Sequence, residues 1–241
     1  VVVPWNDRAA VEAALAEHEV AALLAEPIAA NMGVVPPEEG FLEFLREATR
    51  AAETQLNFDE VITGFRVARG GAQELFGIEP DLTVMGKIIG GGLPAAAFAG
   101  PREAMERIAP AGDVYQAGTL SGNPLAAAAG LATLDGLDTA AYERLGALTD
   151  RLADGFEALA ADRPLQVARA PGLVTLFFSE VPVRNFEDAT ACDTEAHARF
   201  CRALLDRGVD PPPAQVEAWG VSLAHNEAVV DRTLEAADEA I

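Results

Sequence analysis

The stretch "DLTVMGKIIGGGLPAAAFAG", residues 81–100, decides the fold. It holds two short apolar segments, 81–86 and 95–100, which predict strands, and a glycine-rich loop between them that contains Lys87. Upstream, residues 20–26 and 55–60 also have the length of buried strands, and a helical pattern separates them. Helices that alternate with short apolar strands predict a three-layer α/β fold, in which helices cover both faces of a mostly parallel sheet.

Helical periodicity marks the rest of the chain. The pattern predicts one strand, 172–178, in the second half of the chain, and it predicts helices over residues 7–18, 36–52, 101–109, 123–137, 139–161, 194–208 and 226–241. The sequence pattern changes near residue 125 from alternating strands and helices to mostly helices, beginning with a long alanine-rich helix. We therefore expect a domain boundary there, with a smaller α+β domain over residues 126–241.

Composition excludes several classes of partner. The formal net charge of −21 opposes binding to nucleic acid and to anionic membranes, which both require clustered Lys and Arg. No long apolar run and no signal-peptide pattern occur, so we expect a cytoplasmic protein. The acidic surplus resembles that of proteins from extreme halophiles. Cys192 and Cys201 show no metal-ligand spacing, so we expect neither a metal site nor a disulfide.

Lys87 is the only lysine among 17 basic residues. Its neighbours are Met85, Ile88, Ile89 and several glycines, so the sequence predicts that the amine is desolvated. Desolvation lowers the pKa of a lysine, and an unprotonated amine can form a Schiff base with a carbonyl, whereas the guanidinium of arginine stays protonated. A lone surface lysine beside a flexible turn explains this segment equally well.

A carboxylate at a neighbouring strand end favours the nucleophile. Asp59 ends the predicted strand 55–60, and the carboxyl ends of parallel strands open on the same crevice, so Asp59 and Lys87 can meet there. A carboxylate that keeps a ring nitrogen protonated and an amine that holds an aldehyde are the groups that pyridoxal phosphate needs. On structural grounds alone, Asp59 and Glu60 can also be a surface or helix-entry pair.

Five segments carry a family resemblance: "AEPIAANMGVVPPEEGFL", "FDEVITGFRV", "PDLTVMGKIIGGGLPAAAFAG", "YQAGTLSGNPLAAAAGLATL" and "DPPPAQVEAW". Together they resemble the class III (ω) aminotransferases of fold type I, and most closely the glutamate-1-semialdehyde 2,1-aminomutases. The resemblance implies that residues 1–125 are the C-terminal part of the large domain, which binds pyridoxal phosphate, and that residues 126–241 are the small domain. It also implies that an N-terminal part of the family's usual length lies outside this chain.

The resemblance assigns roles at the cofactor ring. Lys87 is implied to hold the cofactor through an imine and to move protons, and Asp59 to pair with the pyridine nitrogen. Val61 is implied to pack on the ring face, and Asn31 to bond the phenolic oxygen. Without the family, Asn31 can simply shape a turn together with Gly33.

Further along the chain, Gly118 and Thr119 are implied to bind the cofactor phosphate of a partner subunit. A small residue lets backbone amides approach an anion, and the hydroxyl adds a donor. A homodimer follows from this placement. Glu217 matches a glutamate at the substrate end of the family's site. As a simpler alternative, Thr119 and Asn123 can be capping residues of the following helix.

The implied reaction moves an amino group within glutamate 1-semialdehyde and yields 5-aminolevulinate, a tetrapyrrole precursor. The pyridoxamine form of the cofactor takes part in the cycle. Two alternatives stay open. One is a general ω-aminotransferase with a separate 2-oxo acid acceptor, and the other is a non-catalytic, truncated homologue.

Two local departures from the family bear on these expectations. Three polar residues, Thr54, Gln55 and Asn57, break the apolar run of the strand before Asp59, which suits an exposed strand, a locally altered reading frame or a degenerating copy. Asp210, Ala214 and Val216 replace what are commonly an apolar residue, a serine and an aromatic residue. The contacts of Glu217 with substrate are therefore less secure than the contacts of the other residues with the cofactor.

Overall fold

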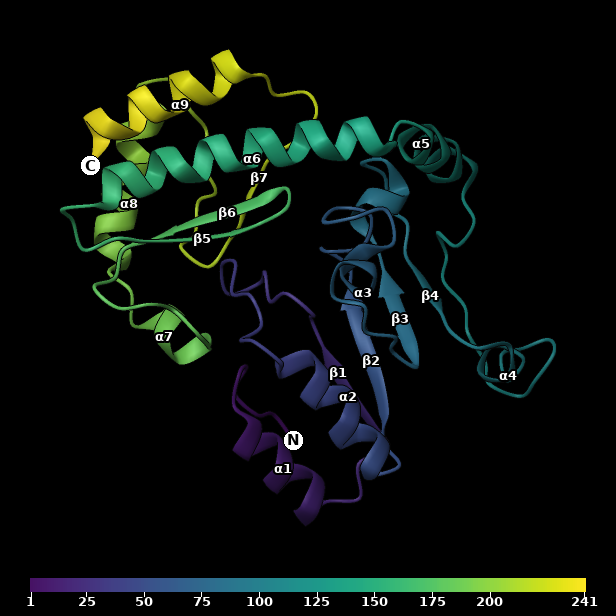
Figure 1. Ribbon diagram of the computed structural model, residues 1–241. Coiled ribbons are helices and arrows are strands. Elements are labelled where there is room, and N and C mark those ends of the chain that lie inside the picture. The colour runs from purple at the N-terminus through teal and green to yellow at the C-terminus, as the bar shows by residue number, and fades with distance from the viewer. The chain divides into compact units, whose positions relative to one another are not determined.

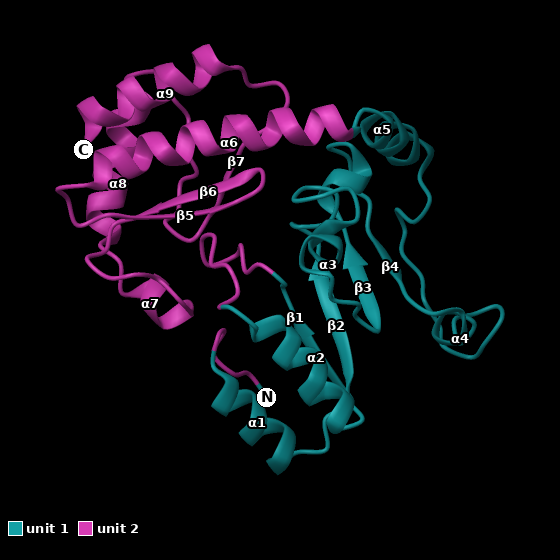
Figure 2. Cartoon of the chain, viewed as in Figure 1, with its two compact units in different colours: residues 1, 7–27, 39–138 teal, residues 2–6, 28–38, 139–241 magenta.

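The computed structural model describes every residue from 1 to 241 (Figure 1). The chain forms two compact units (Figure 2). Unit 1 comprises residues 1, 7–27 and 39–138, and unit 2 comprises residues 2–6, 28–38 and 139–241. The assignment of residues 1–125 to a cofactor-binding domain and of 126–241 to a small domain stays a prediction.

Unit 1 is built on a four-stranded sheet in the order β1-β2-β3-β4. Its strands are β1 (Ala22–Ala25), β2 (Gln55–Glu60), β3 (Leu82–Met85) and β4 (Ala97–Ala99). The first three are parallel, which confirms the expected mostly parallel α/β sheet. β4 runs antiparallel to β3, because the short loop after Lys87 carries no crossover helix of the kind that parallel strands need.

Two of the helices of unit 1 begin at a residue whose side chain caps them. The helices of this unit are α1 (Arg8–Glu17), α2 (Phe41–Ala51), α3 (Gly71–Phe76), α4 (Arg102–Met105), α5 (Pro124–Asp135) and the 3₁₀ helix η1 (Lys87–Gly90). The Asp7 side chain caps α1, and the Asn123 side chain caps α5. The predicted start of a helix at residue 36 is wrong: α2 begins after Gly40, whose φ of +70° is not helical.

Unit 2 packs helices on a small antiparallel sheet. Its elements are α6 (Thr139–Ala160), β5 (Gln166–Ala170), β6 (Leu173–Phe177), α7 (Phe186–Thr190), α8 (Thr194–Asp206), β7 (Trp219–Gly220) and α9 (Glu227–Ala240). The sheet order is β5-β6-β7, and all of β6 is buried. Phe156, Phe200 and Leu204 join β6 in the main core. The sequence pattern predicted β6 but missed the half-exposed β5 and the very short β7.

The polar strand β2 has two different faces. Leu56, Phe58 and Glu60 are buried, whereas Gln55 is exposed and Asn57 and Asp59 are half-buried on the opposite face. Thr54 is buried as well, so the burial pattern leaves the three explanations for the polar residues open. One defect remains, because Asn57 Oδ1 is buried without a hydrogen-bond partner.

No helix of the chain is long and apolar enough to cross a membrane. Nor does the structure place three or more His, Cys, Asp or Glu side chains where they could hold a metal ion.

We predict that Asn57→Leu stabilises the chain. A buried polar atom without a partner costs about 1 to 3 kcal/mol, and leucine of similar size removes that cost and adds apolar contact. The free energy of unfolding, measured by urea denaturation, should rise by about 1 kcal/mol or more. Gln55→Leu on the same face is the control and should change it little, because residue 55 is exposed. Equal effects of the two changes would contradict this account.

Candidate active site

Lys87 stands directly beyond the carboxyl end of β3 and begins η1. Its side chain is exposed, so the prediction of a desolvated amine is wrong. Gly86 and Gly90 are buried and the two isoleucines that follow Lys87 are half-buried, so the apolar flank covers the backbone of the loop and not the ammonium group.

Lys87 is also held in an unfavourable backbone conformation. Its φ is +46°, in the left-handed region that costs a non-glycine residue roughly 1 kcal/mol or more. Glycines are abundant in this loop, and glycine at position 87 would avoid the strain. Strained residues of this kind concentrate at functional sites, so the conformation supports a role for the lysine side chain.

Asp59 lies at the carboxyl end of β2, at the same edge of the sheet as Lys87. In the parallel register, Asp59 lies opposite Val84 and Glu60 lies opposite Met85, so the carboxyl ends of β2 and β3 are level. Asp59 Oδ1 accepts a hydrogen bond from the Val61 amide at 3.0 Å, which holds the carboxylate at the start of the turn. The expected meeting of the two strand ends is therefore present.

Val61 packs beside the lysine loop. A Cβ atom built on Gly86 would lie 3.2 Å from Val61 Cγ1, so only glycine lets the residue before Lys87 approach this closely without a shift. The structure thus brings Asp59, Val61 and Lys87 to one edge of the sheet.

Glu60, the residue after Asp59, has a structural role. Its side chain is 1% exposed, and its carboxylate accepts four hydrogen bonds. The donors are the Ala72 amide at 2.6 Å, the Gln73 amide and side chain at 3.1 Å each, and the Thr63 hydroxyl at 2.9 Å. Glu60 therefore caps α3 and shapes the turn after β2. Sequence reasoning left this role open, although the period-two pattern places Glu60 on the buried face with Leu56 and Phe58.

Gly71 completes this arrangement at the start of α3. Its φ is +73°, and a Cβ atom there would overlap the Glu60 carboxylate. A side chain at position 71 would therefore displace the group that caps the helix.

Helix α5 packs against residues 86–94, the glycine-rich loop that contains Lys87. A Cβ atom on Gly130 would collide with the Ile89 carbonyl, so α5 and η1 touch through their backbones. Asn123, which caps α5, also donates from Nδ2 to the Pro94 carbonyl at 3.2 Å. The capping alternative thus holds for Asn123 and not for Thr119. Gly118 and Thr119 lie just before this helix and are both exposed.

A cavity of about 590 Å³ opens beside Lys87. Arg66, Thr133 and the glycine-rich loop also line it. Two basic residues thus line one cavity in a strongly acidic chain, which favours an anionic or electron-rich ligand. Sequence reasoning missed Arg66, although it closes the segment "DEVITGFR" that carries Asp59 and Val61.

The remaining predicted site residues, Asn31 and Glu217, lie in unit 2 on two loops that a backbone hydrogen bond joins. Ala29 and Val35 exchange backbone hydrogen bonds, so Asn31 and Gly33 do shape a turn, and Asn31 is exposed. The Gly33 amide donates to the Val216 carbonyl at 2.6 Å, next to the exposed Glu217. Asn31 and Glu217 are therefore on neighbouring loops of unit 2.

The buried Gln215 anchors the loop of Glu217. Its Nε2 donates to the Leu176 carbonyl at 2.9 Å, and its Oε1 accepts from the Phe178 amide at 3.2 Å. One side chain thereby bonds the loop to β6 and to the residue that follows it. Sequence reasoning singled out the neighbours of Gln215 and missed this anchor.

The two cysteines and His197 are not among the candidate site residues around Lys87 or around Asn31 and Glu217. Cys192 and Cys201 are free and buried, and burial raises the pKa of both thiols. His197 contacts Cys201 in α8, and burial lowers its pKa. Burial of this kind is typical of structural side chains, which is the role expected of the two thiols.

Open α/β sheets bind ligands at the carboxyl ends of their strands, and a lysine amine can form a Schiff base with a carbonyl, so this sheet edge can hold a carbonyl cofactor. The Aminotransferase class-III family model matches residues 6–215. The chain belongs to the class III aminotransferase family, whose members depend on pyridoxal phosphate.

Among curated relatives, the chain is 53% identical to a glutamate-1-semialdehyde 2,1-aminomutase of Thermomicrobium roseum and 50% identical to that of Aquifex aeolicus. Each alignment covers all of this chain but only 57% and 58% of the relative, so the chain spans little more than half their length.

Solved structures agree on the fold. An ω-transaminase from Sphaerobacter thermophilus matches with a TM-score of 0.91 at 33% identity. A glutamate-1-semialdehyde aminomutase from Pseudomonas aeruginosa in complex with PMP matches with a TM-score of 0.89 at 31% identity. All of this chain and 56% of each of those chains are covered.

We predict that Glu60→Gln destabilises unit 1. The amide would turn an NH₂ group toward the N–H donors of α3 and leave at least one of them unpaired, at about 2 kcal/mol. Urea denaturation should show this loss. Glu74→Gln is the matched control: Glu74 also accepts from a backbone amide, that of Gly70, but it is exposed, so the loss there should stay below about 1 kcal/mol. Similar losses would show that the buried cap is not what holds this turn.

Proposed function

We propose that the protein of which this chain is part performs pyridoxal-phosphate-dependent amino transfer within glutamate 1-semialdehyde and forms 5-aminolevulinate. The observation that carries the proposal is the arrangement of Asp59, Val61 and Lys87 at one sheet edge, in a chain about 50% identical to aminomutases over its whole length. The product places the protein in tetrapyrrole synthesis.

The residues of unit 1 fit the cofactor. The exposed Lys87 amine can reach an aldehyde, the Asp59 carboxylate at the neighbouring strand end can keep a ring nitrogen protonated, and Val61 offers an apolar surface beside the loop. Pyridoxal phosphate, when bound, supplies a carbonyl that takes up amino groups and a ring that accepts electrons.

Three candidate site residues then have distinct roles. Lys87 anchors the cofactor and afterwards, as a free amine, takes and returns the proton at the carbon that bears the amino group. Its strained backbone and the support of α5 hold the amine at the sheet edge. Asn31 is proposed to bond the phenolic oxygen of the cofactor, and Glu217 to contact the substrate.

A homodimer follows from Gly118 and Thr119. Both residues are exposed, and the Ser121 amide donates to the Gly118 carbonyl at 3.0 Å, so they form a surface turn ahead of α5. We propose that this turn serves the phosphate group bound by a partner subunit, where the Thr119 hydroxyl donates a hydrogen bond. Several large apolar side chains are exposed around it, namely Tyr115, Leu120, Leu125 and Leu131, as a subunit interface requires.

A second candidate is an ω-aminotransferase with a separate 2-oxo acid, which the likeness to the Sphaerobacter thermophilus ω-transaminase favours. An aminomutase needs no second acceptor because the amino group returns to the same carbon skeleton. Turnover of the semialdehyde without added 2-oxo acid would therefore support the mutase, and a strict requirement for that acid would support the transaminase.

The cofactor assignment predicts selective labelling of Lys87. Treatment of the chain with pyridoxal phosphate and borohydride should attach the reduced cofactor to Lys87 at lower concentrations than to the amine of Val1. Because the chain has only one lysine, peptide mass spectrometry locates the label without ambiguity.

Asp59→Asn is the matched control for this labelling. It removes the charge that pairs with the ring nitrogen and keeps the size of the side chain, so half-maximal labelling should need at least about tenfold more cofactor. Labelling of Lys87 that equals that of Val1, or that ignores Asp59→Asn, would show that these residues form no cofactor site. A non-catalytic homologue would then be the better description.

We predict that the chain self-associates through the turn at Thr119. Sedimentation at micromolar concentrations should show a dimer, and Leu125→Glu should shift it toward monomer, because a charge in an apolar interface is costly. Leu205→Glu is the control, since Leu205 is a similarly exposed leucine in α8 of unit 2. A monomer at all concentrations would contradict the shared-site proposal.

A further inference from the structure

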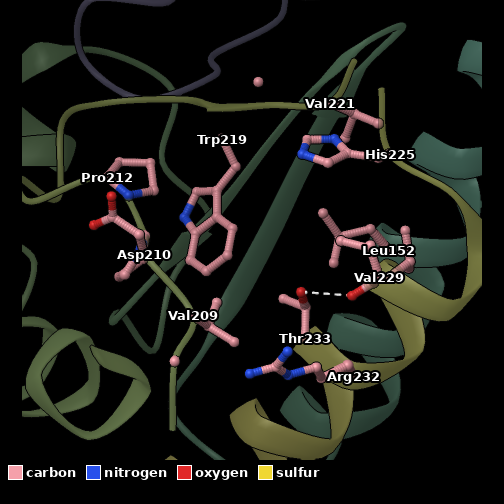
Figure 3. Close-up of a pocket in the computed structure, with 14 residues that line it drawn as sticks. Leu152, Val209, Asp210, Pro212, Trp219, Val221, His225, Val229, Arg232 and Thr233 are labelled. Carbon is pink, nitrogen blue, oxygen red and sulfur yellow. Dashed lines mark hydrogen bonds between the residues drawn. The ribbon is translucent and has the colours of Figure 1, made fainter. Parts of the chain in front are cut away.

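Two cavities of the chain differ in the charges that line them. The cavity in unit 2, of about 440 Å³, has Asp210 and Arg232 in its lining beside the indole of Trp219, so its formal charges balance (Figure 3). The cavity beside Lys87, of about 590 Å³, has Arg66 and Lys87 in its lining and no carboxylate. The chain as a whole has 38 acidic and 17 basic residues, so a lining with two positive charges and no negative one runs against its composition. This difference singles out the cavity beside Lys87 as a site for a ligand of negative charge.

A hydrogen-bonded turn fixes the backbone of Arg66. The Arg66 and Val67 amides both donate to the Thr63 carbonyl, at 3.1 and 3.2 Å, and the Thr63 hydroxyl donates to the Glu60 carboxylate at 2.9 Å. Thr63 and Glu60 are each 1% exposed. The buried carboxylate that caps α3 therefore also anchors the residue that carries the guanidinium.

Both segments that supply a positive charge contain a strained residue. Phe65, directly before Arg66, has a φ of +56°, and Lys87 itself has a φ of +46°. This left-handed conformation is unfavourable for residues with a side chain, and it concentrates at functional sites. The two positive charges of the cavity are thus both carried by backbone that the tertiary structure holds in place.

The guanidinium of Arg66 suits an oxyanion. Its planar fork can donate two parallel N–H bonds to a carboxylate or a phosphate, and it stays protonated. A cavity of this volume is roughly 8 Å across, which is about the Debye length at physiological ionic strength, so the charge of Arg66 acts throughout it. A ligand that suits the cavity therefore combines a carbonyl group for Lys87 with an anionic group.

We propose that Arg66 determines which ligands Lys87 accepts, and that it favours carbonyl compounds with a carboxylate or a phosphate over neutral ones. The inference rests on the proposed role of Lys87 as the amine that bonds a carbonyl, and it adds to that role a residue that selects the ligand. The anionic group belongs either to the substrate, as a carboxylate, or to the cofactor, as a phosphate. The test separates these two sources.

The test measures reductive labelling by aldehydes in the presence of cyanoborohydride. An unprotonated amine adds to the aldehyde carbon and water leaves, and hydride from cyanoborohydride together with a proton from water then gives a stable secondary amine. Lys87 and the terminal amine of Val1 are the two aliphatic amines of the chain. The ratio of label on Lys87 to label on Val1, measured by peptide mass spectrometry, therefore cancels differences in the intrinsic reactivity of the aldehydes.

Two pairs of aldehydes differ in their anionic group. 4-Oxobutanoate is compared with butanal, and pyridoxal phosphate is compared with pyridoxal. In at least one pair the label ratio should be about fivefold higher for the anionic member, as expected for one positive charge roughly 8 Å away in a medium of intermediate dielectric constant. A preference in the first pair that depends on Arg66 assigns the contact to a substrate carboxylate, and one in the second pair assigns it to the cofactor phosphate.

Variants at two neighbouring arginines show whether Arg66 is the cause. Arg66→Gln should abolish the preference for the anionic aldehyde. Arg69→Gln is the matched control, because Arg69 is an exposed arginine of the same segment that donates to the Leu137 carbonyl at 2.8 Å and does not line the cavity. It should leave the preference unchanged. Arg66→Met, which keeps the apolar stem of the side chain, should give the same loss as Arg66→Gln and replaces it if that variant does not fold.

The inference is overturned if neither pair of aldehydes shows a preference in the unaltered chain, or if the changes at Arg66 and Arg69 have equal effects. Its failure differs from failure of the proposed function. Labelling of Lys87 by pyridoxal phosphate that depends on Asp59 but not on Arg66 would overturn this inference alone. Selection of 4-oxobutanoate that depends on Arg66, without any dependence of pyridoxal phosphate labelling on Asp59, would overturn the cofactor assignment alone.

Discussion

The buried carboxylate of Glu60 is the interaction on which the geometry of unit 1 depends. It takes four hydrogen bonds at the point where β2 ends, and it joins the strand to the first amides of α3. A carboxylate without these donors would cost several kcal/mol in this place, so the turn has little freedom. Asp59 on one side of Glu60 and Val61 on the other are positioned as a consequence. The candidate site residue Asp59 and the structural residue Glu60 are thus neighbours with opposite side-chain directions.

The lysine loop is held by backbone contact instead of by charge. Glycines allow η1 to approach Val61 on one side and α5 on the other, and Asn123 joins the cap of α5 to the loop at Pro94. A rigid support of this kind explains how Lys87 keeps a left-handed backbone conformation, since an unsupported lysine would relax to a more favourable one. The amine itself stays accessible. That combination of a fixed backbone and an accessible side chain suits the proposed role of Lys87 as an amine that bonds covalently and then moves protons.

Local signals in the sequence were most reliable where they had a direct physical cause. The predicted helices 7–18 and 123–137 begin at Asp7 and Asn123, and the side chains of both residues cap their helices by accepting from free amides. The start of α2 was misplaced because proline and acidic residues mark a first turn only where the backbone permits one, and Gly40 does not. The short strands β5 and β7 escaped prediction because pairing with the buried β6 defines them, and pairing is not a local property.

The sequence by itself determined the alternation of helices and strands, the family and the candidate residues Asp59, Val61 and Lys87, because periodicity and the order of the residues along the chain carry that information. Only the tertiary structure decided which member of the pair Asp59 and Glu60 is buried, that the Lys87 amine is exposed, and that Asn31 and Glu217 share bonded loops. It also decided that Asp210, Trp219 and Arg232 line one cavity. These facts depend on contacts between residues far apart in the chain, where hydrogen bonding and packing select one arrangement among those that local preference allows.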